Sequence, residues 1–277
     1  MKAIILAGGR GKRLRPITDY IPKPLIPIKN IPIIEWQIKY LKKYGISEVI
    51  VCSGYKTEMI QNYLKNKKLG IKITFSIEKK PLGTGGAIKK AVNKIKEKSF
   101  IVINGDIITN INLKKLLKKE NTIASIQLKT KFGILQTDQD KIIKFDEKKE
   151  IPDLWMNAGI YHLSKKAIKE LPNIGDIEKT LFPNFAKKEK LFTIKFKNIQ
   201  WYSIDSFKDL EESSTVVEEI IKWRIYAPVL CNVTIMYATS STKDSSSLVE
   251  AYFVALFQNA VLLVDFSTIC CSDNIIY

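Results

Sequence analysis

A glycine-rich and basic segment, Leu6-Ala7-Gly8-Gly9-Arg10-Gly11-Lys12-Arg13-Leu14-Arg15-Pro16, completes and follows the apolar run Lys2–Ala7 near the start of the sequence. A short apolar run of this kind predicts a buried strand, and the glycines after it allow the backbone angles of a tight loop. Exposed N–H groups in such a loop bind phosphate, and the cations at positions 10, 12, 13 and 15 can neutralise a triphosphate. The stretch therefore predicts a phosphate-binding loop at the end of a first strand.

This loop does not fit either of two common phosphate-binding patterns. The Walker pattern requires Ser or Thr after its lysine, and Lys12 is followed by Arg13. The dinucleotide fingerprint counted from Gly9 would place its third glycine at Leu14. Taken alone, the loop also allows a plain turn with basic side chains, so the rest of the chain has to decide between the two interpretations.

Outward from the loop, short apolar runs alternate with amphipathic stretches. The expected strands are Lys2–Ala7, Glu48–Ser53, Lys72–Ile77 and Phe100–Asn104, and the expected helices are Pro32–Tyr44, Thr57–Lys65 and Gly86–Lys96. From about residue 122 the expected strands are Ile123–Lys129, Gly133–Thr137, Lys141–Phe145, Ala158–Leu163 and Leu191–Phe196. This rhythm predicts parallel βαβ units. The predicted class is α/β: a Rossmann-like, doubly wound, mostly parallel sheet with a smaller strand-rich lobe.

The overall composition excludes several classes of protein. The net charge is +17, but only four of the 45 basic residues are arginine and the lysines are scattered, which argues against a nucleic-acid interface. The four cysteines show no CxxC spacing and His162 is the only histidine, so a standard zinc site and a His-dependent triad are excluded. The first apolar run is too short for a signal peptide, and we expect a cytoplasmic, reduced protein.

A change of composition near residue 223 predicts a domain boundary. Residues 223–277 carry two basic and four acidic side chains and three of the four cysteines, whereas residues 1–222 are strongly basic. The apolar run Ala251–Val264 is shorter than the roughly 20 residues that span a bilayer, so no membrane partner is expected. We expect one domain over 1–222, with halves of about 1–121 and 122–222, and an atypical tail over 223–277.

An ordered set of further motifs carries a family resemblance. The set comprises Pro22-Lys23-Pro24-Leu25, Pro81-Leu82-Gly83-Thr84-Gly85-Gly86-Ala87-Ile88, Asn104-Gly105-Asp106, Phe145-Asp146-Glu147-Lys148, Asn157-Ala158-Gly159-Ile160-Tyr161 and Trp201-Tyr202-Ser203-Ile204-Asp205-Ser206. With the glycine loop, it resembles the sugar-1-phosphate nucleotidyltransferase (nucleotide-sugar pyrophosphorylase) family over roughly residues 1–222. The stretch from Gly54 to Lys89 looks most like the heptose-1-phosphate and mannose-1-phosphate guanylyltransferase branch.

The resemblance implies a nucleotide site at the loop and a sugar half-site beyond it. The implied nucleotide-binding residues are Leu6, Ala7, Gly8, Gly9, Gly11, Arg13, Gly83, Thr84 and Gly85. The implied sugar-binding residues are Gly133, Glu147, Lys148 and Asn157. Arg13, Lys23 and Lys148 would be the catalytic cations, with Lys23 on a phosphate and Lys148 on the sugar phosphate. Lys149 replaces the proline of the family's Glu-Lys-Pro motif.

Two aspartates are candidate ligands of Mg²⁺, which prefers carboxylate and phosphate oxygens. Asp106 follows a buried strand, where ligands bind in α/β sheets. The commonest family form, Asp-x-Gly-Thr, would place its acid at Ser203. The segment instead resembles the Trp-x-x-(Met or Ile)-Asp-Thr form of cytidylyltransferases, with Trp201 and Asp205 in matching positions.

The predicted partners are a nucleoside triphosphate, with GTP favoured, and a heptose- or mannose-type sugar 1-phosphate. The glycine-lined loop that holds Gly83 favours GTP, because backbone groups can read a purine edge. Cytidylyl, uridylyl or thymidylyl transfer and a catalytically silent regulatory subunit stay open as alternatives, as does a homo-oligomer.

Overall fold

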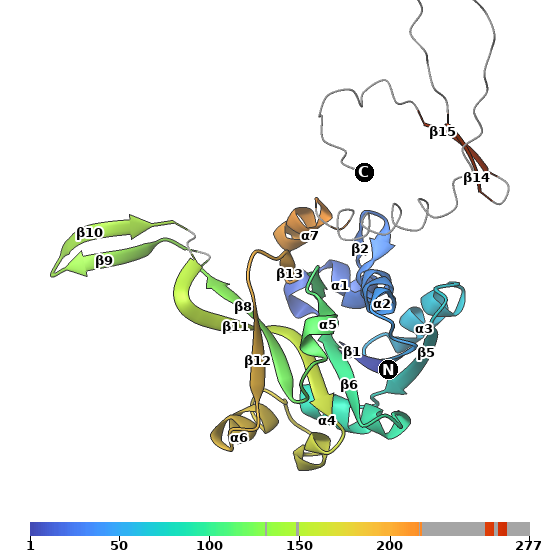
Figure 1. The fold of residues 1–277 in the computed structure, drawn as a ribbon, viewed down its shortest axis with the longest axis horizontal. Coiled ribbons are helices and arrows are strands. Elements are labelled where there is room, and N and C mark those ends of the chain that lie inside the picture. Colours follow the sequence, from blue (N-terminus) through green and yellow to red (C-terminus); the bar gives the residue numbers. More distant parts are fainter. Residues whose placement is uncertain (131, 148–149, 216, 218–252, 258–259, 265–277) are drawn as a thin grey trace, which may run out of the picture. The chain divides into compact units, whose positions relative to one another are not determined.

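The computed structural model describes residues 1–130, 132–147, 150–215, 217, 253–257 and 260–264 of the 277-residue chain. The chain divides into two compact units, Met1–Ile221 and Lys222–Tyr277 (Figure 1). In the second unit, strands β14 (Phe253–Phe257) and β15 (Ala260–Val264) pair antiparallel. No helix among the described residues is long and apolar enough to cross a membrane.

The first unit is organised around a seven-stranded sheet in the order β12-β8-β11-β6-β1-β4-β5. These strands are β1 (Lys2–Ala7), β4 (Glu48–Ser53), β5 (Lys72–Ile77), β6 (Ser99–Asn104), β8 (Thr122–Lys129), β11 (Glu150–Ser164) and β12 (Phe192–Phe196). The run β6-β1-β4-β5 is parallel, β11 lies antiparallel between β6 and β8, and β12 is parallel to β8. The predicted fold class is confirmed.

The central strands are apolar because both faces of the sheet are covered. Every residue of β4 is buried, as are Ala3, Ile4 and Ile5 of β1. Strands that are buried on both faces read as continuous apolar runs. This is why the runs stood out in the sequence.

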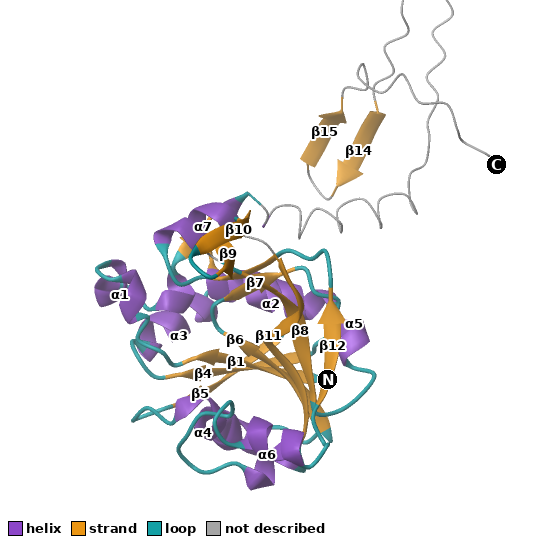
Figure 2. Cartoon of the chain, turned by 90° about the vertical axis from the view of Figure 1, so that its left-hand side faces the viewer, coloured by secondary structure: helices purple, strands orange, loops and turns teal. Residues whose placement is uncertain are grey.

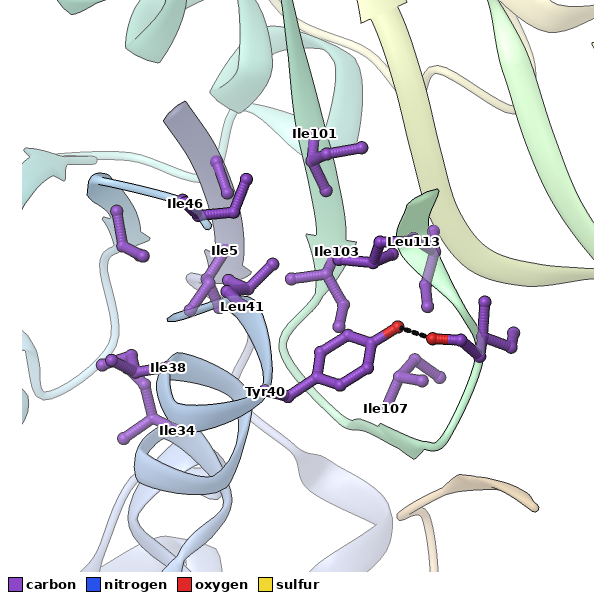
Figure 3. Close-up of a cluster of buried hydrophobic side chains, with 14 of the residues drawn as sticks. Ile5, Ile34, Ile38, Tyr40, Leu41, Ile46, Ile101, Ile103, Ile107 and Leu113 are labelled. Carbon is purple, nitrogen blue, oxygen red and sulfur yellow. Dashed lines mark hydrogen bonds between the residues drawn. The ribbon is translucent and has the colours of Figure 1, made fainter. Parts of the chain in front are cut away.

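Helices cover both faces of the sheet (Figure 2). On one face lie α2 (Ile33–Lys43), α3 (Thr57–Lys65) and α5 (Leu113–Leu116), and on the other lie α4 (Gly83–Ala91) and α6 (Leu181–Lys187). Figure 3 shows the stripe Ile34, Ile38 and Leu41 of α2 facing Ile5 of the sheet. The helical spacing of these side chains is what turns one face of α2 toward the core.

Smaller elements complete the first unit. They are α1 (Ile17–Tyr20), α7 (Phe207–Ser214), and the antiparallel pairs β2 (Pro27–Ile28) with β3 (Ile31–Pro32), β7 (Ile107–Thr109) with β13 (Trp201–Ser203), and β9 (Ile134–Asp138) with β10 (Lys141–Asp146). Single 3₁₀ turns occur at Lys12–Leu14, Lys23–Leu25, Val92–Lys94 and Ala167–Glu170.

Two elements differ from their predicted bounds by more than one residue. Helix α4 begins at Gly83 rather than Gly86 and ends at Ala91 rather than Lys96. A Cβ on Gly86 would lie 2.4 Å from the carbonyl oxygen of Asn173, so the glycines allow close packing that outweighs their poor helix propensity. Strand β11 begins at Glu150 rather than Ala158, because pairing with β8 extends it through a polar stretch that lacks an apolar pattern.

Candidate functional site

A cavity of about 470 Å³ opens at the carboxyl ends of β1 and β6. Parallel strands of an α/β sheet place their ligand sites at this edge. The residues that line the cavity are Leu6, Ala7, Gly8, Gly9, Gly11, Lys12, Arg13, Leu14, Lys23, Pro24, Glu78, Pro81, Leu82, Gly83, Thr84, Ala87, Asn104, Gly105, Asp106, Asp176 and Asp205. The cavity thus gathers the predicted nucleotide and metal residues, except Gly85, from distant parts of the chain.

The glycine loop forms one wall of the cavity. Gly11 has a φ of 61°, a conformation that L side chains rarely adopt. A Cβ on Gly11 would lie 3.0 Å from both Lys23 Cβ and Thr18 Cγ2, and its carbonyl oxygen accepts a hydrogen bond from Thr18 Oγ1 at 3.0 Å. The loop is therefore held tightly against the turn that carries Lys23.

Lys23 lies between two carboxylates in the cavity. Its Nζ is 2.7 Å from Asp106 Oδ2 and 2.9 Å from Asp205 Oδ1, and only 13% of the side chain is exposed. Arg13 Nη1 lies 3.0 Å from Asp205 Oδ2, which also accepts a hydrogen bond from Ser203 Oγ at 3.2 Å. Burial on its own raises the pKa of Asp205, but the hydrogen bond and charge of Lys23, with the charge of Arg13, hold that pKa below its usual value.

Backbone pairing brings the two aspartates together. Asp106 directly precedes β7 and Asp205 closely follows β13, and these strands pair antiparallel with Ser203 opposite Ile107. The N–H of Ile204 donates to the carbonyl oxygen of Asp106 at 3.0 Å. Residues almost one hundred positions apart therefore present their carboxylates to the same point.

Tight local contacts fix each of these carboxylates. A Cβ on Gly105 would lie 2.3 Å from the carbonyl oxygen of Leu6, so only glycine allows the turn that carries Asp106 to approach β1. Asp209 Oδ2 accepts hydrogen bonds from the N–H groups of Asp205 and Ser206 at 2.9 and 2.7 Å. Ser206 and Asp209 form a capping box at the start of α7, and that box orients the backbone of Asp205.

A second group of side chains lies at the start of α4, away from the aspartates. Glu78 directly follows β5, and its Oε2 accepts a hydrogen bond from the N–H of Leu82 at 3.1 Å. Burial raises the pKa of Glu78, although the bond from Leu82 and the charge of Lys90 act in the opposite direction. Glu78 makes no ion pair within the described residues. Its carboxylate therefore carries one backbone hydrogen bond and no ion pair, and it can accept further hydrogen bonds in the cavity wall.

Several of these lining residues were not among the predicted site residues. Glu78 stands within the stretch from Gly54 to Lys89, and an acid before Lys79-Lys80-Pro81 is the signal that could have identified it. Asp176 reaches the cavity through the 173–177 segment that packs on α4, and no sequence pattern marks it. Asn104 and Gly105 belong to a quoted motif in which only Asp106 received a role.

The remaining predicted residues lie outside the cavity lining. Gly85 is buried in α4, where a Cβ would lie 2.9 Å from the carbonyl oxygen of Gly175. Gly133 and Glu147 flank the β9–β10 hairpin and are close to each other, since a Cβ on Gly133 would lie 3.0 Å from Glu147 Oε2. Asn157 lies on β11. Lys148 and its neighbour Lys149 lie outside the described residues.

The donor set at the cavity is suited to a divalent cation that also binds phosphate. Asp106 and Asp205 already face one cation, the Lys23 ammonium, so their oxygens converge. In the described part of the chain, no cluster of three or more Asp, Glu, His or Cys could hold a metal ion alone. Mg²⁺ bound to phosphates uses one or two protein carboxylates, and this pair meets that requirement.

Comparison with known proteins gives concordant matches. Residues 2–219 match the family described as nucleotidyl transferase. A D-glycero-alpha-D-manno-heptose 1-phosphate guanylyltransferase from Aneurinibacillus thermoaerophilus is 42% identical over 200 residues, which cover 69% of this chain and 86% of the relative. A protein of the same name from Campylobacter jejuni is 46% identical over 171 residues, which cover 60% of this chain and 76% of the relative. The crystal structure of HddC from Yersinia pseudotuberculosis complexed with GMP-PN matches with a TM-score of 0.61 and 30% sequence identity. The match covers 77% of this chain and 98% of that chain.

Proposed function

The chain belongs to the nucleotidyl transferase family, and from this premise we propose that it transfers a guanylyl group from GTP to a heptose-type sugar 1-phosphate. The products would be a GDP-sugar and pyrophosphate. The observation that carries this proposal is the cavity that joins the glycine loop to the Asp106–Lys23–Asp205 cluster. The names of the two heptose-1-phosphate guanylyltransferases support the choice of substrates.

The reaction needs charge neutralisation more than proton transfer. A phosphate oxygen of the sugar 1-phosphate forms a bond to the α-phosphorus of GTP, and the bond from that phosphorus to the bridging β-phosphate oxygen breaks. The pyrophosphate leaves with the electron pair. Because the attacking oxygen is already anionic, no general base is required. Arg13 and Lys23 would stabilise the charge on the phosphates while the loop N–H groups position them.

Asp106 and Asp205 would hold Mg²⁺ at the same cluster. The cation, when bound, supplies positive charge that draws the phosphates together and favours departure of pyrophosphate. Lys23 would then be free to move from the carboxylates to a phosphate oxygen, because the metal ion would take over its role as counter-ion.

Glu78 supports guanine as the base. Guanine presents two adjacent donors, its N1–H and its 2-amino group, on one edge, and a carboxylate can accept from both. Uracil, thymine and cytosine would each turn at least one acceptor toward Glu78 in the same position. Pro81, Leu82 and Ala87 add apolar surface against which a purine could lie.

The sugar phosphate would lie on the side of β11 and the β9–β10 hairpin. Asn157, Gly133 and Glu147 are the proposed ligands of its hydroxyl groups, and Lys148 the proposed ligand of its phosphate. The support for these four roles is their match to the motifs of the family.

A pyrophosphate-release assay tests the proposed function. GTP, CTP, UTP and dTTP would each be supplied with D-glycero-α-D-manno-heptose 1-phosphate, mannose 1-phosphate or glucose 1-phosphate. We expect release with GTP and the heptose phosphate to exceed that of any pyrimidine nucleotide. Faster release with a pyrimidine nucleotide would favour the alternative transfer reactions, and no release with any pair would favour a silent regulatory subunit.

A further inference from the structure

A chain of hydrogen bonds runs beneath the cavity from the sugar side to the nucleotide side. It begins at Asn157, passes through the hydroxyl of Tyr161 and the carboxylate of Glu178, and ends at Thr84 in the first turn of α4. We propose that Tyr161 and Glu178 are a positioning pair that orients Asn157 and Thr84 together. This inference rests on the proposed function, in which Asn157 binds the sugar, and on the nucleotide-binding role that the family resemblance implies for Thr84.

The hydroxyl of Tyr161 is the centre of this chain. Tyr161 is fully buried on β11, with its ring against Phe182 at a centroid distance of 5.0 Å. The hydroxyl oxygen accepts a hydrogen bond from Asn157 Nδ2 at 3.0 Å. Burial raises the pKa of Tyr161 well above its usual value, so the hydroxyl keeps its proton and can donate to Glu178.

Both carboxylate oxygens of Glu178 are engaged. Oε1 lies 3.4 Å from the Tyr161 hydroxyl, and Oε2 accepts a hydrogen bond from Thr84 Oγ1 at 2.6 Å. Thr84 Oγ1 in turn accepts from the N–H of Ile177 at 2.9 Å. Thr84 is thus held from two sides while it lines the cavity.

The consequence for Asn157 is a fixed amide orientation. Its Nδ2 donates to the Tyr161 hydroxyl, and its Oδ1 accepts from the N–H of Gly159 at 2.8 Å. A flip of the side-chain amide, which exchanges Nδ2 and Oδ1, would break both hydrogen bonds. Without the hydroxyl of Tyr161, only the bond to Gly159 would restrain the amide. A sugar hydroxyl bound by Asn157 would then meet a side chain of poorly defined orientation.

Tyr161→Phe tests the first part of the pair, with Tyr40→Phe as its matched control. Tyr40 is also a buried tyrosine whose hydroxyl donates one hydrogen bond, to the carbonyl oxygen of Ile111 at 2.7 Å, but that bond lies in the core beneath α2 (Figure 3). Both variants should lower stability. Only Tyr161→Phe should raise the KM for the sugar 1-phosphate, by about tenfold, with the KM for GTP within about twofold of wild type.

Glu178 is tested by comparing Glu178→Ala with Glu178→Gln. Glutamine keeps one acceptor for Tyr161 and an amide that can donate to Thr84 Oγ1, so it should restore both KM values to within about threefold of wild type. Alanine breaks both bonds and should raise both KM values. Glu170→Ala is the control, because Glu170 is bonded only to Asn184 and Lys188 among the described residues.

Three results would count against the pair. Equal KM values for the sugar 1-phosphate in Tyr161→Phe and Tyr40→Phe would overturn the role of Tyr161. Equal damage from Glu178→Gln and Glu178→Ala would show that the charge of Glu178 matters rather than its hydrogen bonds. A wild type without turnover on any substrate pair would contradict the proposed function and this inference with it, whereas the first two results leave the proposed function intact.

Discussion

Lys23 is the residue on which the charge balance of the site depends. Its ammonium lies within 2.9 Å of one oxygen from each of two carboxylates, at the point where a divalent cation would bind. Two carboxylates this close repel each other unless a cation lies between them. The Lys23 ammonium and a metal ion therefore compete for the same position, because either cation alone would neutralise the two carboxylates.

Replacement of Lys23 should consequently strengthen metal binding while it abolishes turnover. In Lys23→Gln, we expect Mn²⁺ to bind at least about tenfold more tightly without nucleotide, because the competing positive charge is gone. Electron paramagnetic resonance of a Mn²⁺ titration measures this. Lys12→Gln is the control, since Lys12 lines the cavity but forms no ion pair with Asp106 or Asp205. Unchanged or weaker Mn²⁺ binding in Lys23→Gln would refute the competition.

Glu78 should set the preference for guanine. ITP lacks the 2-amino group of GTP, so the wild type should favour GTP over ITP in kcat/KM by about tenfold or more. Glu78→Gln should reduce this ratio strongly. Asp176→Asn should leave it unchanged, because Asp176 lines the same cavity but is paired with Lys179 at 3.2 Å. If Glu78→Gln kept the wild-type ratio, the base would have to be read elsewhere.

The pH dependence of that preference follows from the pKa of Glu78. Burial raises this pKa, so the carboxyl takes up its proton at a higher pH than an ordinary glutamate does. The protonated group donates a hydrogen bond and no longer accepts two. The ratio of kcat/KM for GTP to that for ITP should therefore fall as the pH drops through the raised pKa. A ratio that stays constant over that range would contradict the role of Glu78.

At the scale of elements, α4 shows where local sequence rules are insufficient. Strands β1, β4 and β5 and helix α3 have the predicted bounds, since apolar spacing alone defines them. The start of α4 was predicted three residues late, because glycine is a weak helix former. Its glycines are needed for contact with the 173–177 segment, and such a contact between distant residues has no signature in either segment.

Gly83 is the most constrained of these glycines and gives an element-scale prediction. Its φ is 74°, and a Cβ would lie 2.6 Å from the carbonyl oxygen of Gly175. Gly83→Ala should therefore lower the free energy of unfolding by at least about 1–3 kcal/mol, measured by urea denaturation. Gly9→Ala is the control: a Cβ there meets nothing within 4 Å, and stability should change by less than about 0.5 kcal/mol. Equal losses in both variants would contradict the packing argument.

At the scale of the whole molecule, every residue that lines the cavity belongs to the unit Met1–Ile221. A protein that ends at Lys222 should therefore retain turnover. Pyrophosphate release by the shortened protein measures this, with circular dichroism as the check that it is folded. A folded but inactive shortened protein would show that the tail contributes to the reaction.

The sequence predicted those site residues whose positions follow from the ends of predicted strands and from the motifs beside them. Arg13, Lys23, Asp106 and Asp205 meet in one cavity, as their places in the predicted sheet and motifs suggested. Glu78 and Asp176 were missed because their chemistry comes from burial and from packing between segments about one hundred residues apart. Sequence motifs identify residues at strand ends more readily than residues whose properties depend on distant neighbours.

We infer that nucleotidyl transfer takes place at the Asp106–Lys23–Asp205 cluster, and a pair of variants, Asp205→Asn and Ser203→Ala, distinguishes this site from the alternative alignment of the segment. Asp205→Asn should lower kcat by at least about two to three orders of magnitude, since one lost contact of about 3–4 kcal/mol has that effect. Ser203→Ala removes only the 3.2 Å hydrogen bond to Asp205 and should leave kcat within about threefold of wild type. A large loss of kcat in Ser203→Ala together with a small loss in Asp205→Asn, in variants that are both folded, would contradict the assignment of Asp205 to this site.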